Sequence, residues 1–212
     1  MPLYKTIKPN SYTSIYVWKI EESFNDLIKN TPLTLRSEKR LNSMKSELHQ
    51  RGFLSVRHLL KEAGYNDFDL FYTKNGKPHL KNGKRISITH SFTFSALIIS
   101  DAEVGIDIEK NREKIKIIQH KFVNFEKGFI NKGDDYIEQL TVIWGAKESL
   151  YKIYPFGGLT FKNDIDINSF QIADKKTTGY IKVKNWDKNY NIFFEQLNGF
   201  TLVYAIESST ND

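Results

Sequence analysis

Cysteine is absent from this chain of 212 residues, and no long apolar run interrupts it. Without cysteine, the protein has neither disulfides nor thiolate metal sites. The longest apolar run near the middle, residues 96–99, is far too short to span a bilayer. Residues 1–10 also lack the apolar stretch of a signal peptide. We therefore expect a cytoplasmic protein with no membrane role.

The composition indicates a globular, basic protein. Apolar residues make up 40% of the chain and aromatic residues 14%, enough for a substantial core in one or two small units. The net charge of +6 and the pI near 9.2 favour an acidic partner. Nucleic acid is the first generic candidate for that partner.

Two short acidic motifs carry most of the chemical information. The first, residues 105–109, reads Gly-Ile-Asp-Ile-Glu and ends an apolar alternation typical of a strand. This alternation places Asp107 and Glu109 on one face, roughly 6 to 7 Å apart. Two carboxylates at that spacing can close around a single hard cation.

The second motif, residues 144–152, reads Trp-Gly-Ala-Lys-Glu-Ser-Leu-Tyr-Lys and lies in the strongest helix pattern, residues 134–154. Apolar residues occupy one arc of this helix, and Glu148 and Lys152 occupy the other side, with Lys147 beside them. The pattern predicts that the charged side faces outward and meets the first motif across a cleft. Gly145 costs about 1 kcal/mol in a helix relative to alanine, which indicates close packing against a neighbouring strand.

Each motif alone has an ordinary interpretation. A glutamate and a lysine four residues apart are usually a solvated pair worth a few tenths of a kcal/mol. An Asp-x-Glu at a strand end is commonly turn chemistry. The combination supplies three carboxylates and two lysines, which suit a divalent metal held against a diphosphate.

The order Gly-Ile-Asp-x-Glu, then Trp-x-x-Lys-Glu-x-x-x-Lys, resembles the 4'-phosphopantetheinyl transferase superfamily. Gly-Lys-Pro at 76–78 and Ile-Ser-Ile-Thr-His-Ser at 86–91 resemble segments of its surfactin-type branch, in the same order. The resemblance spans roughly residues 36–160. Such enzymes use magnesium to transfer the phosphopantetheine arm of coenzyme A to a serine hydroxyl of an apo carrier protein, releasing adenosine 3',5'-bisphosphate.

This resemblance implies a role for each charged residue of the two motifs. Asp107, Glu109 and Glu148 would ligate Mg²⁺, with Mn²⁺ as an alternative ion. Glu148 is also the candidate base for the serine proton, either directly or through a metal-bound water. Lys152 would neutralise charge on the phosphate oxygens, and Lys147 would assist on the diphosphate or on the arm.

The resemblance also implies a coenzyme A site in the N-terminal half. Arg51 and His90 match positions that hold the 3'-phosphate, whereas Lys77 and Thr89 match contacts around the nucleotide. Thr89 keeps a hydroxyl where the branch often has serine. Two further cations are weaker candidates for the same phosphate: Arg36 and Lys39.

The predicted elements indicate an α+β fold made of two similar α/β subdomains, residues 1–102 and residues 103–212, the second carrying the metal motifs. The family resemblance implies that a pseudo-twofold axis relates them and that the ligand binds between them, so a monomer suffices. The expected helices are residues 21–29, 37–63 and 134–154, with several helical segments across residues 114–130. The expected strands are residues 14–20, 68–72, 86–90, 94–100, 104–109, 164–167, 179–186, 192–197 and 200–207.

Two other functions fit part of the pattern. A magnesium-dependent phosphohydrolase acting on a nucleotide diphosphate would use water in place of the serine. A module for single-stranded nucleic acid would use basic charge and tyrosines, but the tyrosines are scattered and form no stacking motif. The expected partners are therefore coenzyme A and an acidic apo carrier protein that binds transiently. The sequence does not specify the pathway of that carrier.

Overall fold

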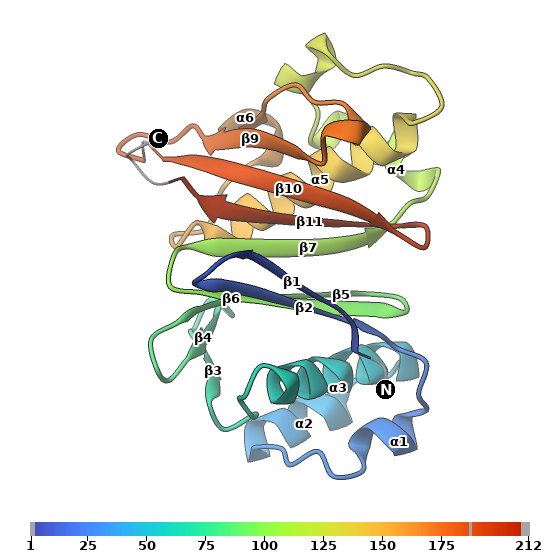
Figure 1. Cartoon of the computed structure of the whole chain (residues 1–212), viewed down its shortest axis with the longest axis vertical. Coiled ribbons are helices and arrows are strands. Elements are labelled where there is room, and N and C mark those ends of the chain that lie inside the picture. Colours follow the sequence, from blue (N-terminus) through green and yellow to red (C-terminus); the bar gives the residue numbers. More distant parts are fainter. Residues whose placement is uncertain (1–2, 187, 209–212) are drawn as a thin grey trace. The chain divides into compact units, whose positions relative to one another are not determined.

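The computed structural model describes residues 3–186 and 188–208. The chain divides into two compact units, Met1–Ala102 and Glu103–Asp212. Each unit contains an antiparallel sheet packed against one long helix (Figure 1). The similar amounts of helix and strand fit the α+β class.

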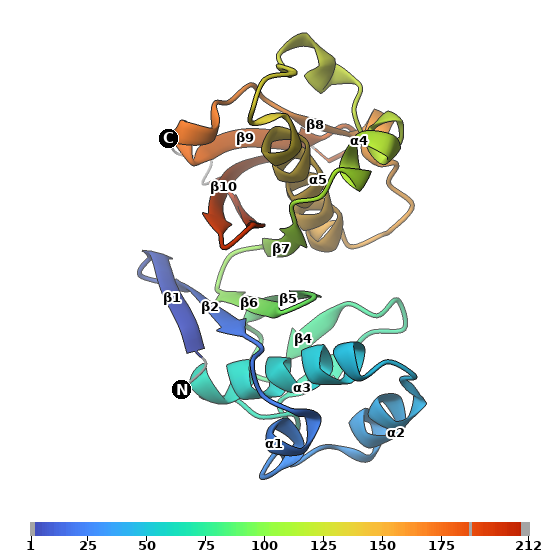
Figure 2. The ribbon, with the colours of Figure 1, turned by 90° about the vertical axis from the view of Figure 1, so that its right-hand side faces the viewer.

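In the N-terminal unit, the strand order of the main sheet is β1-β2-β6-β5. Helix α3 lies along one face of this sheet, and α1 and α2 lie on the side of α3 away from the sheet (Figure 1 and Figure 2). The elements are β1 Leu3–Asn10, β2 Thr13–Lys19, α1 Phe24–Ile28, α2 Leu35–Ser43, α3 Glu47–Glu62, β5 Arg85–Ser91 and β6 Phe94–Ser100, with a separate hairpin of β3 Leu70–Tyr72 and β4 Pro78–Leu80.

The predicted single helix over residues 37–63 is wrong, because two helices occupy this stretch. Helix α2 ends where Met44 adopts an extended backbone, and α3 begins after Ser46, which is also extended. Helix α2 begins at Thr34, whose side chain accepts a hydrogen bond from the Ser37 N–H. The break allows α2 and α3 to run in different directions while both contribute to one core.

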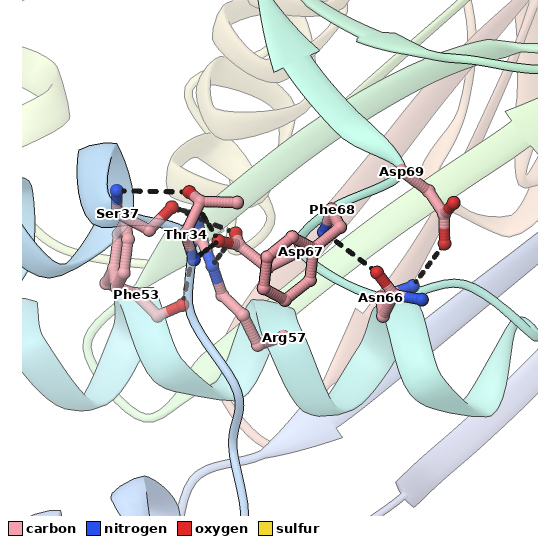
Figure 3. Close-up of polar contacts among 8 residues, drawn as sticks. All are labelled: Thr34, Ser37, Phe53, Arg57, Asn66, Asp67, Phe68 and Asp69. Atoms are coloured by element: carbon pink, nitrogen blue, oxygen red, sulfur yellow. Dashed lines mark hydrogen bonds and ion pairs between the residues drawn. The ribbon is translucent and has the colours of Figure 1, made fainter.

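A buried polar network holds α2, α3 and the segment before β3 together (Figure 3). Arg57 donates to Asp67 at 3.0 Å, and both side chains are almost fully buried. The carboxylate of Asp67 also accepts hydrogen bonds from the N–H and hydroxyl of Thr34 and from the hydroxyl of Ser37. Burial alone would raise the pKa of Asp67, but these hydrogen bonds and the Arg57 charge outweigh burial and lower it.

In the C-terminal unit, the strand order is β7-β11-β10-β9-β8, and α5 lies across one face of the sheet (Figure 2). The strands are β7 Val104–Lys110, β8 Ile165–Ile167, β9 Lys176–Ile181, β10 Asn189–Leu197 and β11 Phe200–Glu207. The helices are α4 Lys114–Ile118, α5 Tyr136–Ile153 and α6 Phe161–Asp164, with the 3-10 turns η1 Gln119–Lys121, η2 Phe125–Gly128 and η3 Ile172–Asp174. Within the described residues, no helix has both the length and the apolar character required to cross a membrane.

Two glycines let α5 approach the sheet closely. A Cβ atom at Gly105 of β7 would overlap the backbone oxygen of Ser149, and one at Gly145 would lie 2.7 Å from Val203 Cγ2 on β11. Neither contact would be possible for a real Cβ atom without a shift of its surroundings. The predicted close packing of Gly145 against a strand is therefore confirmed.

Candidate active site

Strand β7 presents the first acidic motif to α5. Gly105 lies against Ser149 of α5, and Asp107 and Glu109 follow at two-residue intervals on the same face of the strand. Asp107 is paired across the sheet with Val203, the residue beside Gly145 of α5. The sheet register and the close helix approach therefore bring both motifs together.

The direct link between the two motifs is an ion pair. Lys152 Nζ lies 2.7 Å from Asp107 Oδ1 and also donates to the Ile106 carbonyl at 2.8 Å. The Asp107 side chain is 7% exposed and that of Lys152 is 27% exposed, so the pair is partly shielded from water. The last turn of α5 is thereby fixed to β7.

Glu148 lies in the field of the same groups. The pKa of Glu148 is raised to about 7: burial contributes most, the charge of Asp107 contributes next and Glu109 adds a little, whereas Lys152 opposes the rise. A carboxyl group with this pKa exchanges its proton readily at neutral pH, as a general base requires. Glu148 therefore interacts electrostatically with Asp107, Lys152 and Glu109, and Lys152 pairs directly with Asp107.

The donor chemistry of these three carboxylates fits magnesium, which prefers oxygen ligands. The charges of Asp107 and Glu109 add to the effect of burial on the pKa of Glu148, and a divalent cation would relieve this repulsion. Among residues 3–186 and 188–208, however, no three His, Asp or Glu side chains are arranged to hold a metal ion. In this arrangement the cation against Asp107 is the ammonium of Lys152.

The expectation that Lys147 faces outward beside Lys152 is wrong. Its side chain is fully buried, and its ammonium contacts Glu126 Oε1 at 2.7 Å. Burial lowers the pKa of Lys147, and the charge of Glu126 opposes this effect. Helix α5 is buried on most of its circumference, because the segments around Phe122 and Phe161 cover the side where the pattern placed solvent. This ammonium is not placed to contact a diphosphate.

In the N-terminal unit, one of the predicted coenzyme A residues lies on the helix that carries another. A Cβ at Gly52 of α3 would be 3.0 Å from His90 Nδ1, so the imidazole lies directly on the helix at the residue that follows Arg51. Arg51 donates to the Ile20 carbonyl at 3.2 Å. The sequence analysis missed Gly52, although a glycine inside a helix was the available signal.

The other predicted coenzyme A residues are spread over this unit. Thr89 precedes His90 on β5, so its side chain leaves the opposite face of the strand. Lys77 lies in the turn between β3 and β4, where its N–H donates to Thr73 Oγ1 at 3.2 Å. Arg36 is close to the same hairpin, with its guanidinium 5.7 Å from the centre of the Tyr72 ring.

A cavity of about 220 Å³ in the C-terminal unit adjoins Glu109. Its other lining residues are cationic, apolar or hydroxyl-bearing: Lys110, Arg112, Lys114, Ile115, Ile118, Thr141 and Trp144. The sequence analysis missed this cavity, because its walls come from β7, α4 and α5.

The unit that holds the carboxylates is also the part of the chain that resembles known proteins. Residues 103–205 match the family model of the 4'-phosphopantetheinyl transferase superfamily. The match includes both acidic motifs and the whole of α5. It supports phosphopantetheinyl transfer in general, a reaction for which the superfamily uses coenzyme A and carrier proteins, and it gives no support to a phosphohydrolase. The search of curated proteins found no match.

Proposed function

We propose that this protein is a 4'-phosphopantetheinyl transferase of the surfactin-type branch. It transfers the 4'-phosphopantetheine arm of coenzyme A to a serine of an apo carrier protein and releases adenosine 3',5'-bisphosphate. The observation that carries this proposal is the meeting of Asp107, Glu148 and Lys152, which come from both acidic motifs, inside the unit that matches the superfamily. The segments 76–78 and 86–91 support the assignment to the branch.

Asp107, Glu109 and Glu148 would hold the magnesium ion. When bound, this ion supplies positive charge to the pyrophosphate oxygens of coenzyme A. Lys152 already lies against Asp107, so its ammonium would be close enough to contact the same pyrophosphate oxygens. The ammonium of Lys152 would act where negative charge grows as the bond to the leaving bisphosphate breaks.

Glu148 is the proposed base for the serine hydroxyl. Serine is a weak nucleophile, and its proton must leave as oxygen bonds to the phosphorus of the phosphopantetheine arm. The pKa of Glu148, raised to about 7 by burial and then by Asp107, suits a group that accepts a proton at neutral pH. Direct transfer to Glu148 and transfer through a water held by the site are both compatible with this position.

The N-terminal unit would contribute to coenzyme A binding. His90 and Arg51 are proposed to bind the 3'-phosphate, since His90 lies against α3 at Gly52, the residue after Arg51, and cationic N–H groups bind phosphate strongly. Lys77 and Thr89 are proposed contacts of the nucleotide. These assignments rest on the resemblance of their segments to the branch.

The proposed protein partner is an acidic apo carrier. The cavity beside Glu109 combines the cations Lys110, Arg112 and Lys114 with apolar side chains. Such a lining suits an acidic surface that also presents an apolar side chain. Its position next to Glu109, a proposed metal ligand, supports delivery of the carrier serine to this site.

The deciding experiment incubates the protein with coenzyme A, magnesium and a panel of purified apo carrier proteins. Intact mass spectrometry should show one phosphopantetheine added to a carrier, and only when coenzyme A and magnesium are both present. Release of bisphosphate without any change in carrier mass would instead indicate a phosphohydrolase. No addition to any carrier of the panel would contradict the proposal.

A further inference from the structure

Lys147 and Glu126 form a buried ion pair that the proposed chemistry does not use. Both side chains are 0% exposed, and Lys147 Nζ lies 2.7 Å from Glu126 Oε1. Two carbonyl oxygens complete the surroundings of the ammonium, Phe122 O at 2.7 Å and Phe161 O at 2.9 Å. All three N–H groups of the ammonium therefore have an acceptor.

The pair joins α5 to segments that are far apart in the sequence. Glu126 accepts hydrogen bonds from the N–H of Asn124, in its own segment, and from the N–H of Ile167 on β8. Lys147 reaches the Phe122 carbonyl in the connection that leads to α5, and the Phe161 carbonyl at the start of α6. The middle of α5 is thus attached to β8, α6 and the preceding connection.

Stability alone does not explain such a pair. Removing two charges from water is costly, and neutral side chains of similar size often replace buried ion pairs without loss of stability. The pair instead fixes the orientation of the Lys147 side chain, because its hydrogen bonds allow only one direction for the ammonium. That orientation is transmitted to the neighbouring residues of the helix.

The geometry of α5 makes this direction relevant to Glu148. Successive helical residues are rotated by about 100°, so Lys147 and Ser149 project to either side of Glu148. Ser149 lies against Gly105 of β7, and its hydroxyl is 3.3 Å from the Val203 carbonyl of β11. With Lys147 held on one side and Ser149 on the other, rotation of α5 about its axis is fixed, and Glu148 is aimed towards Asp107.

We propose that the Lys147–Glu126 pair is a positioning device that fixes the rotation of α5 and thereby aligns Glu148 with Asp107. This inference rests on the proposed function, since alignment matters only if Glu148 acts with Asp107. It assigns Lys147 a role inside the unit, as a positioning residue that does not touch the diphosphate.

The test compares unmodified protein with the double variant Lys147→Met/Glu126→Gln, which removes both charges and keeps similar volumes. The matched control is Arg57→Met/Asp67→Asn, which removes the buried ion pair of the N-terminal unit. Transfer is measured with coenzyme A and an apo carrier, and binding of Mn²⁺ in the presence of coenzyme A is measured separately by electron paramagnetic resonance. Thermal unfolding shows which variants are folded at the assay temperature.

For Lys147→Met/Glu126→Gln we expect kcat and Mn²⁺ affinity to fall by about 10-fold to 100-fold, the usual effect of losing a group that orients a metal ligand. The KM for coenzyme A should change little, and the control, if folded at the assay temperature, should keep kcat and Mn²⁺ affinity. If the double variant does not fold, Glu126→Asp, which keeps both charges but draws the carboxylate away from the Lys147 ammonium, should show the same losses to a smaller degree.

Normal kcat and normal Mn²⁺ affinity in a folded variant, with only a lower unfolding temperature, would overturn this inference and leave the proposed function intact. Equal losses in the Arg57/Asp67 control would also overturn it, because the effect would then be general destabilisation. Unmodified protein that neither binds Mn²⁺ nor modifies any carrier would overturn the proposed function, and this inference with it.

Discussion

Adjacent residues of α5 have opposite environments. Lys147 is fully buried in an ion pair with Glu126, whereas Glu148 lies near Asp107 and its pKa is raised to about 7, first by burial and then by Asp107. In the sequence the two look alike, as neighbouring charges on a helix. Their difference arises from which parts of the chain cover each side of the helix.

At the residue scale, removing either carboxylate should abolish transfer. Asp107→Ala and Glu148→Gln are each expected to lower kcat/KM by about 100-fold or more, because each removes a proposed metal ligand and Glu148→Gln also removes the base. Both variants should still be folded at the assay temperature, which thermal unfolding checks. Glu138→Gln, on the first turn of the same helix, serves as the control and should keep full activity. Near-normal rates for both Asp107→Ala and Glu148→Gln would refute a shared site.

The second residue-scale prediction concerns His90 and its neighbour Gly52. His90→Ala should raise the KM for coenzyme A by about 10-fold and leave the KM for the 3'-dephospho form unchanged, since only the first carries the 3'-phosphate. Gly52→Ala should act in the same direction, because its methyl group would lie 3.0 Å from His90 Nδ1 and displace the ring. Gly128→Ala, where an added Cβ has open space, is the matched control. An unchanged preference between the two substrates would exclude this role of His90.

At the element scale, the attachment of α5 to the sheet depends on Gly105. Gly105→Ala is expected to lower the free energy of unfolding by about 1–3 kcal/mol, because the methyl group would overlap the Ser149 backbone oxygen. Chemical denaturation measures this change, and Gly128→Ala again provides the control. A variant as stable as the control would show that α5 does not pack on β7 as closely as described.

Also at the element scale, the Asp67 carboxyl group links α2 to α3, and its protonation affects stability. The pKa of Asp67 is lower when folded than the value of about 3.9 for a free side chain. The unfolded chain therefore takes up this proton first as the pH falls. The stabilisation from Asp67 is complete above about pH 5 and is lost below about pH 4.

Denaturation at a series of pH values tests this dependence. Asp67→Asn should lose about 3 kcal/mol near pH 7, because Arg57 then remains buried without its partner. The difference from the unmodified protein should shrink towards low pH, where Asp67 is protonated in both states. Asp69→Asn, a neighbour that accepts one local hydrogen bond, should show no such convergence. A constant difference across the pH range would refute the linkage.

The sequence predicted most elements but not all their limits. Strand β6 was predicted with its observed ends, and α5 within two residues at its start. Strand β1 was missed, and the predicted strand over 179–186 is instead β9, Lys176–Ile181, followed by an isolated bridge. The break between α2 and α3 has no proline or glycine at residues 44–46 to mark it. Helix periodicity continues through such a break, since the side-chain pattern does not record a change of direction.

At the scale of the whole molecule, the net charge of +6 predicts electrostatic attraction of an acidic carrier. Raising the salt from about 0.1 M to about 1 M shortens the Debye length from about 10 Å to about 3 Å, and the KM for the carrier should rise several-fold. Lys114→Glu, in the cavity beside Glu109, should raise it further at low salt and leave the KM for coenzyme A unchanged. Steady-state kinetics at both salt concentrations measure this, and a salt-independent KM would count against an acidic partner.

By itself, the sequence identified the charged groups of the candidate site and the elements that carry them. The order of the two motifs, the two-residue period of the strand and the helical pattern of residues 134–154 depend only on local spacing. Tertiary structure alone decided that Lys147 is buried, that Gly52 supports His90 and that a cavity adjoins Glu109. The physical reason is that a periodic pattern reports which face of an element is apolar, whereas the burial of a charged residue depends on acceptors supplied by distant segments.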